Sequence, residues 1–163
     1  FVKVVDAEML AFSQGVTRRG SYAAYLHMSH PEIEEFLDGR KPTGGDTNRK
    51  FINLHHGIVI PDAFMELIHR ATKEEGFDDS WDLIDPHSKQ VVKTVSARAL
   101  WVKILQNRME TGEPYLMFED AIQNHLPDFQ KRKGLKVHHS NLCSEITLAI
   151  MMTGKSMVLL FLI

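Results

Sequence analysis

The sequence predicts an α/β fold, because strand-like segments alternate with helix-like segments along most of the chain. Three segments indicate strands: residues 21–28 alternate apolar with small or polar residues, residues 51–60 are rich in apolar and β-branched residues, and residues 114–118 are short and apolar. Of the 163 residues, 44% are hydrophobic and 25% are charged, which is ordinary for about one globular domain.

The composition also excludes several classes of protein. A formal net charge of −2 gives no reason to expect a nucleic-acid partner, and a single cysteine cannot form an internal disulfide. No signal peptide is visible, and the terminal apolar run is too short for a membrane helix. We therefore expect a cytoplasmic protein. The chain opens at Phe1 within a helical pattern, so we expect a piece of something larger.

In the first half, residues 1–13 have the apolar spacing of an amphipathic helix, and residues 13–21 (SQGVTRRGS) form a basic, glycine-punctuated loop. After the strand at residues 21–28, Ser29 is expected to cap a helix with Pro31 in its first turn. Residues 38–50 are predicted to be a solvated loop that leads to the strand at residues 51–60.

In the second half, Pro61 opens another helix, and residues 81–95 resemble a hairpin around Pro86. Ser96 should cap a longer helix that runs to about Glu110, with Leu105 among its inward residues. After the strand at residues 114–118, residues 127–136 are expected to be a polar loop that leads to VHHSNLCSEITL, residues 137–148.

The single cysteine, Cys143, is the first candidate for chemistry. An isolated cysteine is most often a small buried hydrophobe. If residues 141–146 are extended, however, Asn141, Cys143 and Glu145 lie on one face of the strand. A buried unpaired carboxylate is costly, so this face suits a pocket wall better than a core. Because Glu145 would disfavour a thiolate, the pattern favours a neutral thiol or a radical over a cysteine protease.

No metal site is predicted. The pairs His55-His56 and His138-His139 consist of adjacent residues, which face opposite sides of a strand and cannot easily share one ion. The glycine-rich segment GRKPTGGD lacks the strand and helix that flank a phosphate-binding loop.

Several motifs together resemble the central catalytic region of the large subunit of class I ribonucleotide reductase. They run in the family's order from about Phe1 to Leu148: RRGSYAAYLHMSHPEIEEFLDGRKPTGGDTNRK, WDLIDPH, VVKTVSARALW, TGEPYLMFED and SNLCSEITL. The resemblance implies that residues 1–148 are part of a ten-stranded α/β barrel, with the radical cysteine on a loop at its centre. It does not extend to residues 149–163.

The resemblance also implies roles for individual residues. Cys143 matches the thiyl-radical cysteine that removes the hydrogen at the substrate ribose 3′ carbon. Glu145 matches the base that takes the 3′ hydroxyl proton, and Asn141 matches the amide that hydrogen-bonds the ribose hydroxyls. Gln14 and Arg18 lie in a segment that resembles the specificity loop, which links a bound effector nucleotide to the choice of substrate base.

The expected partners follow from the same resemblance. The substrate would be a ribonucleoside diphosphate and the product a deoxyribonucleotide. No cofactor would be bound by this chain: a metal-containing small subunit would supply the radical, nucleoside triphosphates would act as effectors, and a thioredoxin-like protein would be the reductant. The setting would be the cytoplasm of a bacterium or of a phage-infected host.

The chain departs from the family in two respects. The two further cysteines that supply reducing electrons are missing, and residues 149–163 form an apolar tail unlike the family. A split gene with a complementary large-subunit fragment, a frameshift and a truncated assembly of sequence data all remain open. So do two rival functions: an inactive remnant or interaction module without turnover, and an ordinary thiol enzyme that uses Cys143 and a histidine.

Overall fold

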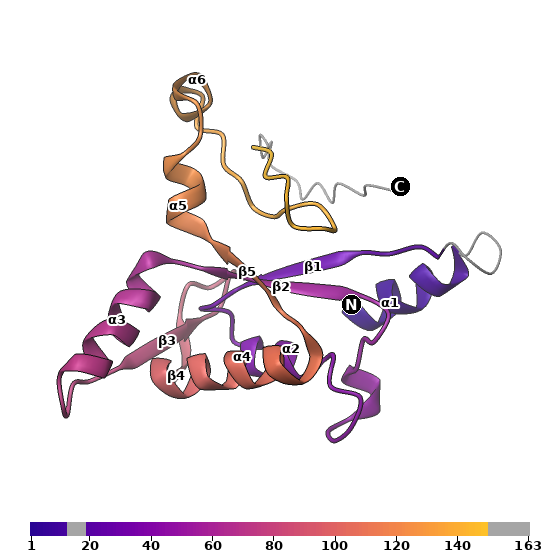
Figure 1. Ribbon diagram of the computed structural model, residues 1–163, viewed down its shortest axis with the longest axis horizontal. Coiled ribbons are helices and arrows are strands. Elements are labelled where there is room, and N and C mark those ends of the chain that lie inside the picture. Colours follow the sequence, from indigo (N-terminus) through magenta and orange to yellow (C-terminus); the bar gives the residue numbers. More distant parts are fainter. Residues whose placement is uncertain (13–18, 150–163) are drawn as a thin grey trace.

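The computed structural model describes residues 1–12 and 19–149, which form mixed helices and strands as expected (Figure 1). In chain order the elements are α1 Val2–Ala11, β1 Ala23–His27, α2 Ile33–Asp38, the 3-10 helix η1 Thr47–Arg49, β2 His55–Ile60, α3 Asp62–Lys73, β3 Ser80–Ile84, β4 Val91–Ser96, α4 Ala97–Thr111, β5 Tyr115–Phe118, α5 Glu119–Asn124 and α6 Asp128–Arg132. The three predicted strands and the predicted hairpin are confirmed.

The main sheet of the described residues is parallel, with β2 between β1 and β5. Gly57 of β2 stands in register with Tyr25 of β1 on one side and with Tyr115 of β5 on the other. Parallel neighbours need long crossover connections, and here α2 lies in the first connection while α3, the β3–β4 hairpin and α4 lie in the second.

The two faces of this sheet are covered differently. Figure 1 shows α2, α4 and the hairpin on one side, and α5, α6 and the chain that follows them on the other. We call the first the helix face and the second the thiol face, because the second carries the chain that contains Cys143. Along β2 the alternation of a strand sends Ile58 and Ile60 into the large core on the helix face, while Val59 packs with Met117 and Val137 on the thiol face.

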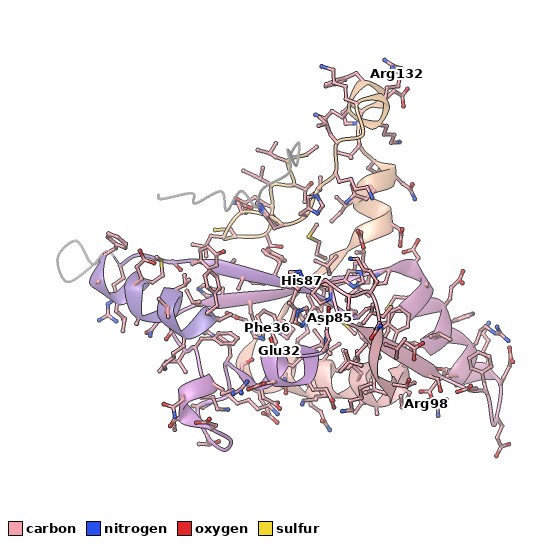
Figure 2. All side chains as sticks on the ribbon, turned by 180° about the vertical axis from the view of Figure 1, so that it is seen from behind. Glu32, Phe36, Asp85, His87, Arg98 and Arg132 are labelled. Atoms are coloured by element: carbon pink, nitrogen blue, oxygen red, sulfur yellow. The ribbon has the colours of Figure 1, made fainter. Side chains whose placement is uncertain are left out.

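The hairpin and α4 form as their sequences predict. Strands β3 and β4 pair antiparallel, and Asp85 closes their turn by accepting hydrogen bonds from the backbone N–H groups of His87 and Ser88; Figure 2 labels Asp85 and His87 at this turn. The Ser96 hydroxyl accepts from the Ala99 N–H at 3.1 Å and so caps α4.

Three predictions about elements are wrong. Ser29 does not cap α2: the helix begins at Ile33 with Glu32 at its N-cap, and no side chain caps it. Leu105 is 42% exposed, because α4 packs through Leu100 and Ile104, and the next residue is turned about 100° away from that face.

The third error concerns residues 127–136, which are not a simple loop. They contain the short helix α6, which follows Pro127 and has Asp128 in its first turn and Arg132 in its last, the charge order that a helix dipole favours. Figure 2 shows Arg132 on this helix, far from the sheet. A run of basic residues therefore indicated a loop where the chain forms a turn of helix.

Candidate active site

Cys143 lies in a tight turn. The Ser144 N–H donates to the Asn141 carbonyl at 3.0 Å, which closes a four-residue turn with Cys143 at its third position. Ser144 has a φ of 65°, in the left-handed region, so the chain leaves the turn sharply. Cys143 is exposed, and so is Glu145.

The side chain of Asn141 holds this turn together. Its Oδ1 accepts from the backbone N–H of Glu145 at 3.1 Å and of Ile146 at 2.9 Å, and the Ser140 hydroxyl lies 3.2 Å from the same oxygen. Asparagine commonly stabilises turns in this way, by standing in for a backbone carbonyl. Because Oδ1 is occupied, the amide nitrogen is the part of Asn141 that can serve a ligand.

The prediction that residues 141–146 form an extended strand is therefore wrong. The side chain of Asn141 competes successfully for backbone N–H groups that a strand would pair with a neighbour. The structure still brings Asn141, Cys143 and Glu145 together, but within one turn and not along one strand face. The resemblance, which implied a loop for the cysteine, agrees with this geometry.

The sheet beneath the turn presents two tyrosines and a glycine in one row. Tyr25, Gly57 and Tyr115 are in register across the three strands. A Cβ added to Gly57 would lie 2.4 Å from the Tyr25 ring, so glycine is required for that ring to lie across β2. The row forms part of the thiol face.

The Tyr25 hydroxyl connects this row to the turn. Burial raises the pKa of Tyr25, and the neighbouring hydroxyls of Ser144 and Ser140 lower it by less. The hydroxyl oxygen is itself buried and has no hydrogen bond of ordinary geometry among the described residues. Ser140 precedes the cysteine turn and Ser144 ends it, so the Tyr25 hydroxyl lies near the turn.

Tyr115 continues this row on the side of Gly57 opposite Tyr25. Burial raises the pKa of Tyr115, and the charges of Glu113 and, when ionised, of Tyr25 and Cys143 raise it further. The His55 ring stacks beside the Tyr115 ring, with centroids 6.0 Å apart and planes 8° from parallel. Tyr25, His55 and Tyr115 thus form an aromatic surface on the side of the sheet where the chain that contains Cys143 lies (Figure 1).

A buried carboxylate lies at the edge of this surface. Glu113, with its side chain 7% exposed, accepts from Nδ1 of His55, from Nδ1 of His56 at 3.0 Å and from the His56 N–H at 3.1 Å. The Arg40 Nε lies 3.4 Å from the same carboxylate. Burial would raise the pKa of Glu113, but the hydrogen bonds from both histidines and the charge of Arg40 outweigh it and hold the pKa far below its usual range.

Sequence reasoning missed this cluster. It correctly placed His55 and His56 on opposite faces of a strand, but it asked only whether they could share a metal ion. The available signal was an acid directly after a helix-ending glycine and two residues before a strand, Gly112-Glu113, which places a carboxylate beside the start of the neighbouring parallel strand. The two histidines share that carboxylate.

Two further predictions from the sequence concern the specificity loop and metal binding. Gln14 and Arg18 lie outside the residues that the structure describes, so their role stays a prediction. Within residues 1–12 and 19–149, no three His, Cys, Asp or Glu side chains are grouped so that they could hold a metal ion.

The model of the ribonucleotide reductase barrel domain matches residues 1–153. This chain belongs to the ribonucleotide reductase family. Its three-stranded parallel sheet is accordingly a part of that barrel domain, and the sheet does not close on itself within the described residues.

Viral large subunits are among its similar relatives. The chain is 53% identical over 138 residues to the ribonucleoside-diphosphate reductase large subunit of Invertebrate iridescent virus 6, a match that covers 85% of this chain and 14% of that protein. It is also 53% identical over 148 residues to the putative large subunit of Frog virus 3, covering 91% and 25% of the two chains. The chain therefore spans a quarter or less of the length of these two relatives.

A solved structure supports the fold. The class Id ribonucleotide reductase alpha subunit of Actinobacillus ureae aligns with a TM-score of 0.59 and 24% identity, over 91% of this chain and 30% of that one. At this identity the likeness shows the fold alone. In the part of the reductase chain described here, no helix is both long and apolar enough to cross a membrane.

Proposed function

We propose that this chain is a part of the catalytic subunit of a ribonucleoside-diphosphate reductase and that Cys143 is its radical cysteine. Membership of the ribonucleotide reductase family supports the reaction class. The observation that carries the assignment of the residue is the turn itself: the chain's single cysteine is exposed on it, Asn141 begins it, and Glu145 directly follows it and donates its N–H to the Asn141 side chain.

The proposed chemistry assigns one step to each residue. A thiyl radical on Cys143 removes the hydrogen atom from the ribose 3′ carbon and becomes a thiol. The Glu145 carboxylate takes the proton of the 3′ hydroxyl, and the 2′ hydroxyl leaves as water with a proton from a dithiol, which also supplies two electrons and becomes a disulfide. The 3′ carbon then takes a hydrogen atom back from the Cys143 thiol, which restores the thiyl radical. The Asn141 amide nitrogen donates to the ribose hydroxyls, which fits the structural role of its Oδ1 in the turn.

The two electrons for the reduction need a dithiol that becomes a disulfide. This chain has one cysteine, so the dithiol belongs to a complementary large-subunit fragment that is reduced in turn by a thioredoxin-like protein. A metal-containing small subunit supplies the radical. Nucleoside triphosphates act as effectors through Gln14 and Arg18, and the cytoplasm is the setting. Residues 1–148 are the catalytic part, and residues 149–163 are a divergent tail.

The test is reconstitution. The chain is mixed with a fragment that supplies the remaining barrel and both further cysteines, together with a small subunit, a dithiol reductant and a nucleoside diphosphate. Deoxyribonucleotide formation should appear with the wild type and be absent with Cys143→Ser. Equal turnover of the variant would remove Cys143 from the mechanism, and the lack of any complex would favour a remnant without turnover.

A further inference from the structure

The carboxylate of Glu113 reaches both faces of the sheet. Its Oε2 accepts from His56, whose ring is fully buried on the helix face, while its Oε1 accepts from His55 on the thiol face. An ionised carboxylate can only accept, so each histidine donates from Nδ1 and carries its proton there. One acid therefore fixes the tautomer and the ring plane of two histidines that point in opposite directions.

The helix-face arm is rigid. The His56 ring lies edge-on to the rings of Phe36 and Phe51, with centroids 5.2 and 5.5 Å away. Burial lowers the pKa of His56 by more than Glu113 raises it, so the ring is neutral. His56 is held among aromatic rings, and the Arg40 Nε lies 3.4 Å from the same carboxylate. The Glu113 carboxylate therefore has little freedom to move.

His55, the histidine on the thiol face, is the one whose ring has room to move. The side chain of His55 is 35% exposed, and its ring contacts Tyr115 by near-parallel stacking. Tyr115 belongs to the thiol face, over which the chain that contains Cys143 lies (Figure 1), and an ionised Cys143 would raise the pKa of Tyr115. Without the hydrogen bond to Glu113, the half-exposed His55 ring could turn about its side-chain bonds and leave the Tyr115 ring unsupported.

Stability alone does not explain this arrangement. A buried charged cluster is often no more stabilising than apolar residues of the same size, whereas removal of one partner is costly. What such a cluster provides is a fixed geometry, and here the fixed geometry ends at the Tyr115 ring, on the face of the sheet that carries the thiol.

We propose that Glu113 and His55 are positioning residues for the Cys143 turn and that they act through the Tyr115 ring. This inference deepens the proposed function and rests on it for the effect on turnover. The effect on the order of the turn is independent of that function, so the two can be tested separately.

The first experiment measures backbone amide exchange of residues 144–146 in the full 163-residue chain, by mass spectrometry. Glu113→Gln removes the charge, and His55→Phe keeps a ring beside Tyr115 but cannot donate. Exchange should become about fivefold faster in both, the change that one net hydrogen bond of about 1 kcal/mol produces. Circular dichroism and thermal melting establish that each variant is folded.

The matched control is Glu119→Gln. Glu119 also pairs with a histidine of this sheet, with Oε2 3.3 Å from Nε2 of His27, but this pair is at the end of the sheet away from Glu113. Exchange at residues 144–146 should not change in this variant. An unchanged rate in folded His55→Phe, or an equal increase in the control, would overturn the proposal; if Glu113→Gln does not fold, His55→Phe decides alone.

The second experiment uses the reconstituted reductase. Both variants should lower kcat about fivefold with little change in KM, because the substrate contacts remain and only the placement of the thiol is disturbed. If exchange quickens but no reductase activity is ever found, the proposed function fails and the positioning role stands. If wild-type activity is present but exchange and kcat are unaffected, the positioning role fails alone.

Discussion

Single residues decide the shape of the surface under the cysteine. Gly57 is the clearest case, because it stands between Tyr25 and Tyr115 in register and its missing side chain leaves room for the Tyr25 ring. The Tyr25 hydroxyl is buried near Ser140 and Ser144, which precede and end the cysteine turn. A side chain at position 57 would therefore displace the Tyr25 ring on the face of the sheet that carries the thiol.

Gly57→Ala should destabilise the protein by about 1–3 kcal/mol, the usual cost of overpacking a well-filled site. The added methyl would lie 2.4 Å from the Tyr25 ring, which must move. Urea unfolding measures the loss. In a Tyr25→Ala background the same substitution should cost much less, and equal costs in the two backgrounds would show that the ring is not the obstacle.

Glu113 gives a prediction about pH. Its pKa is depressed in the folded protein from an unfolded value of about 4.3, so its contribution to stability is full above that value and is lost as the pH falls towards the folded pKa. The difference in unfolding free energy between wild type and Glu113→Gln should thus be largest above about pH 5 and shrink in more acidic solution. Denaturant titrations at several pH values measure this difference; a constant difference would contradict the assigned hydrogen bonds.

At the scale of elements, the ends of helices show where local sequence rules hold. Ser96 follows directly from β4 and caps α4 with its hydroxyl, while it also donates to Asp79 at 2.6 Å. Ser29 has the same residue type before a helix and a proline two residues later, yet α2 begins only at Ile33. The difference lies in the backbone, which turns at Pro31 and Glu32 before the helix starts.

Ser96→Ala should lower the unfolding free energy by about 1 kcal/mol, because an orphan N–H of α4 loses its acceptor. Ser29→Ala is the matched control and should change stability by less than about 0.5 kcal/mol. Thermal or chemical unfolding of both variants compares them. Equal losses would mean that Ser29 has a stabilising role that the helix boundaries do not explain.

At the scale of the whole molecule, the sheet has two outer strands. In the described residues β1 and β5 each pair only with β2, so one edge of each strand lacks a strand neighbour. Unpaired edges are templates for pairing with another chain. A barrel removes such edges by closing, and the barrel-domain family of this chain makes closure by further strands the natural arrangement.

The isolated chain should therefore self-associate as its concentration rises, which light scattering can follow. A shortened chain that ends at Ala149 separates two causes. If it associates as strongly as the full chain, the sheet edges drive association; if it stays monomeric, the deleted residues 150–163, which end in an apolar run, are responsible. A full-length chain that is monomeric at every concentration would contradict the expected effect of open edges.

The sequence by itself determined the strands, most of the helices and the family. An apolar, β-branched run identified β2, and a serine cap followed by inward apolar residues identified α4, because both patterns reflect local structure. The cysteine motif was specific because its residue types are rare in combination. It did not determine the shape of the Cys143 turn. The backbone N–H groups of Glu145 and Ile146 could pair with a neighbouring strand or with the Asn141 side chain, and only the folded chain shows that they pair with Asn141. Nor did it join Glu113 to His55 and His56, since they lie 58 and 57 positions away along the chain and only parallel pairing of β2 with β5 brings them within a hydrogen bond.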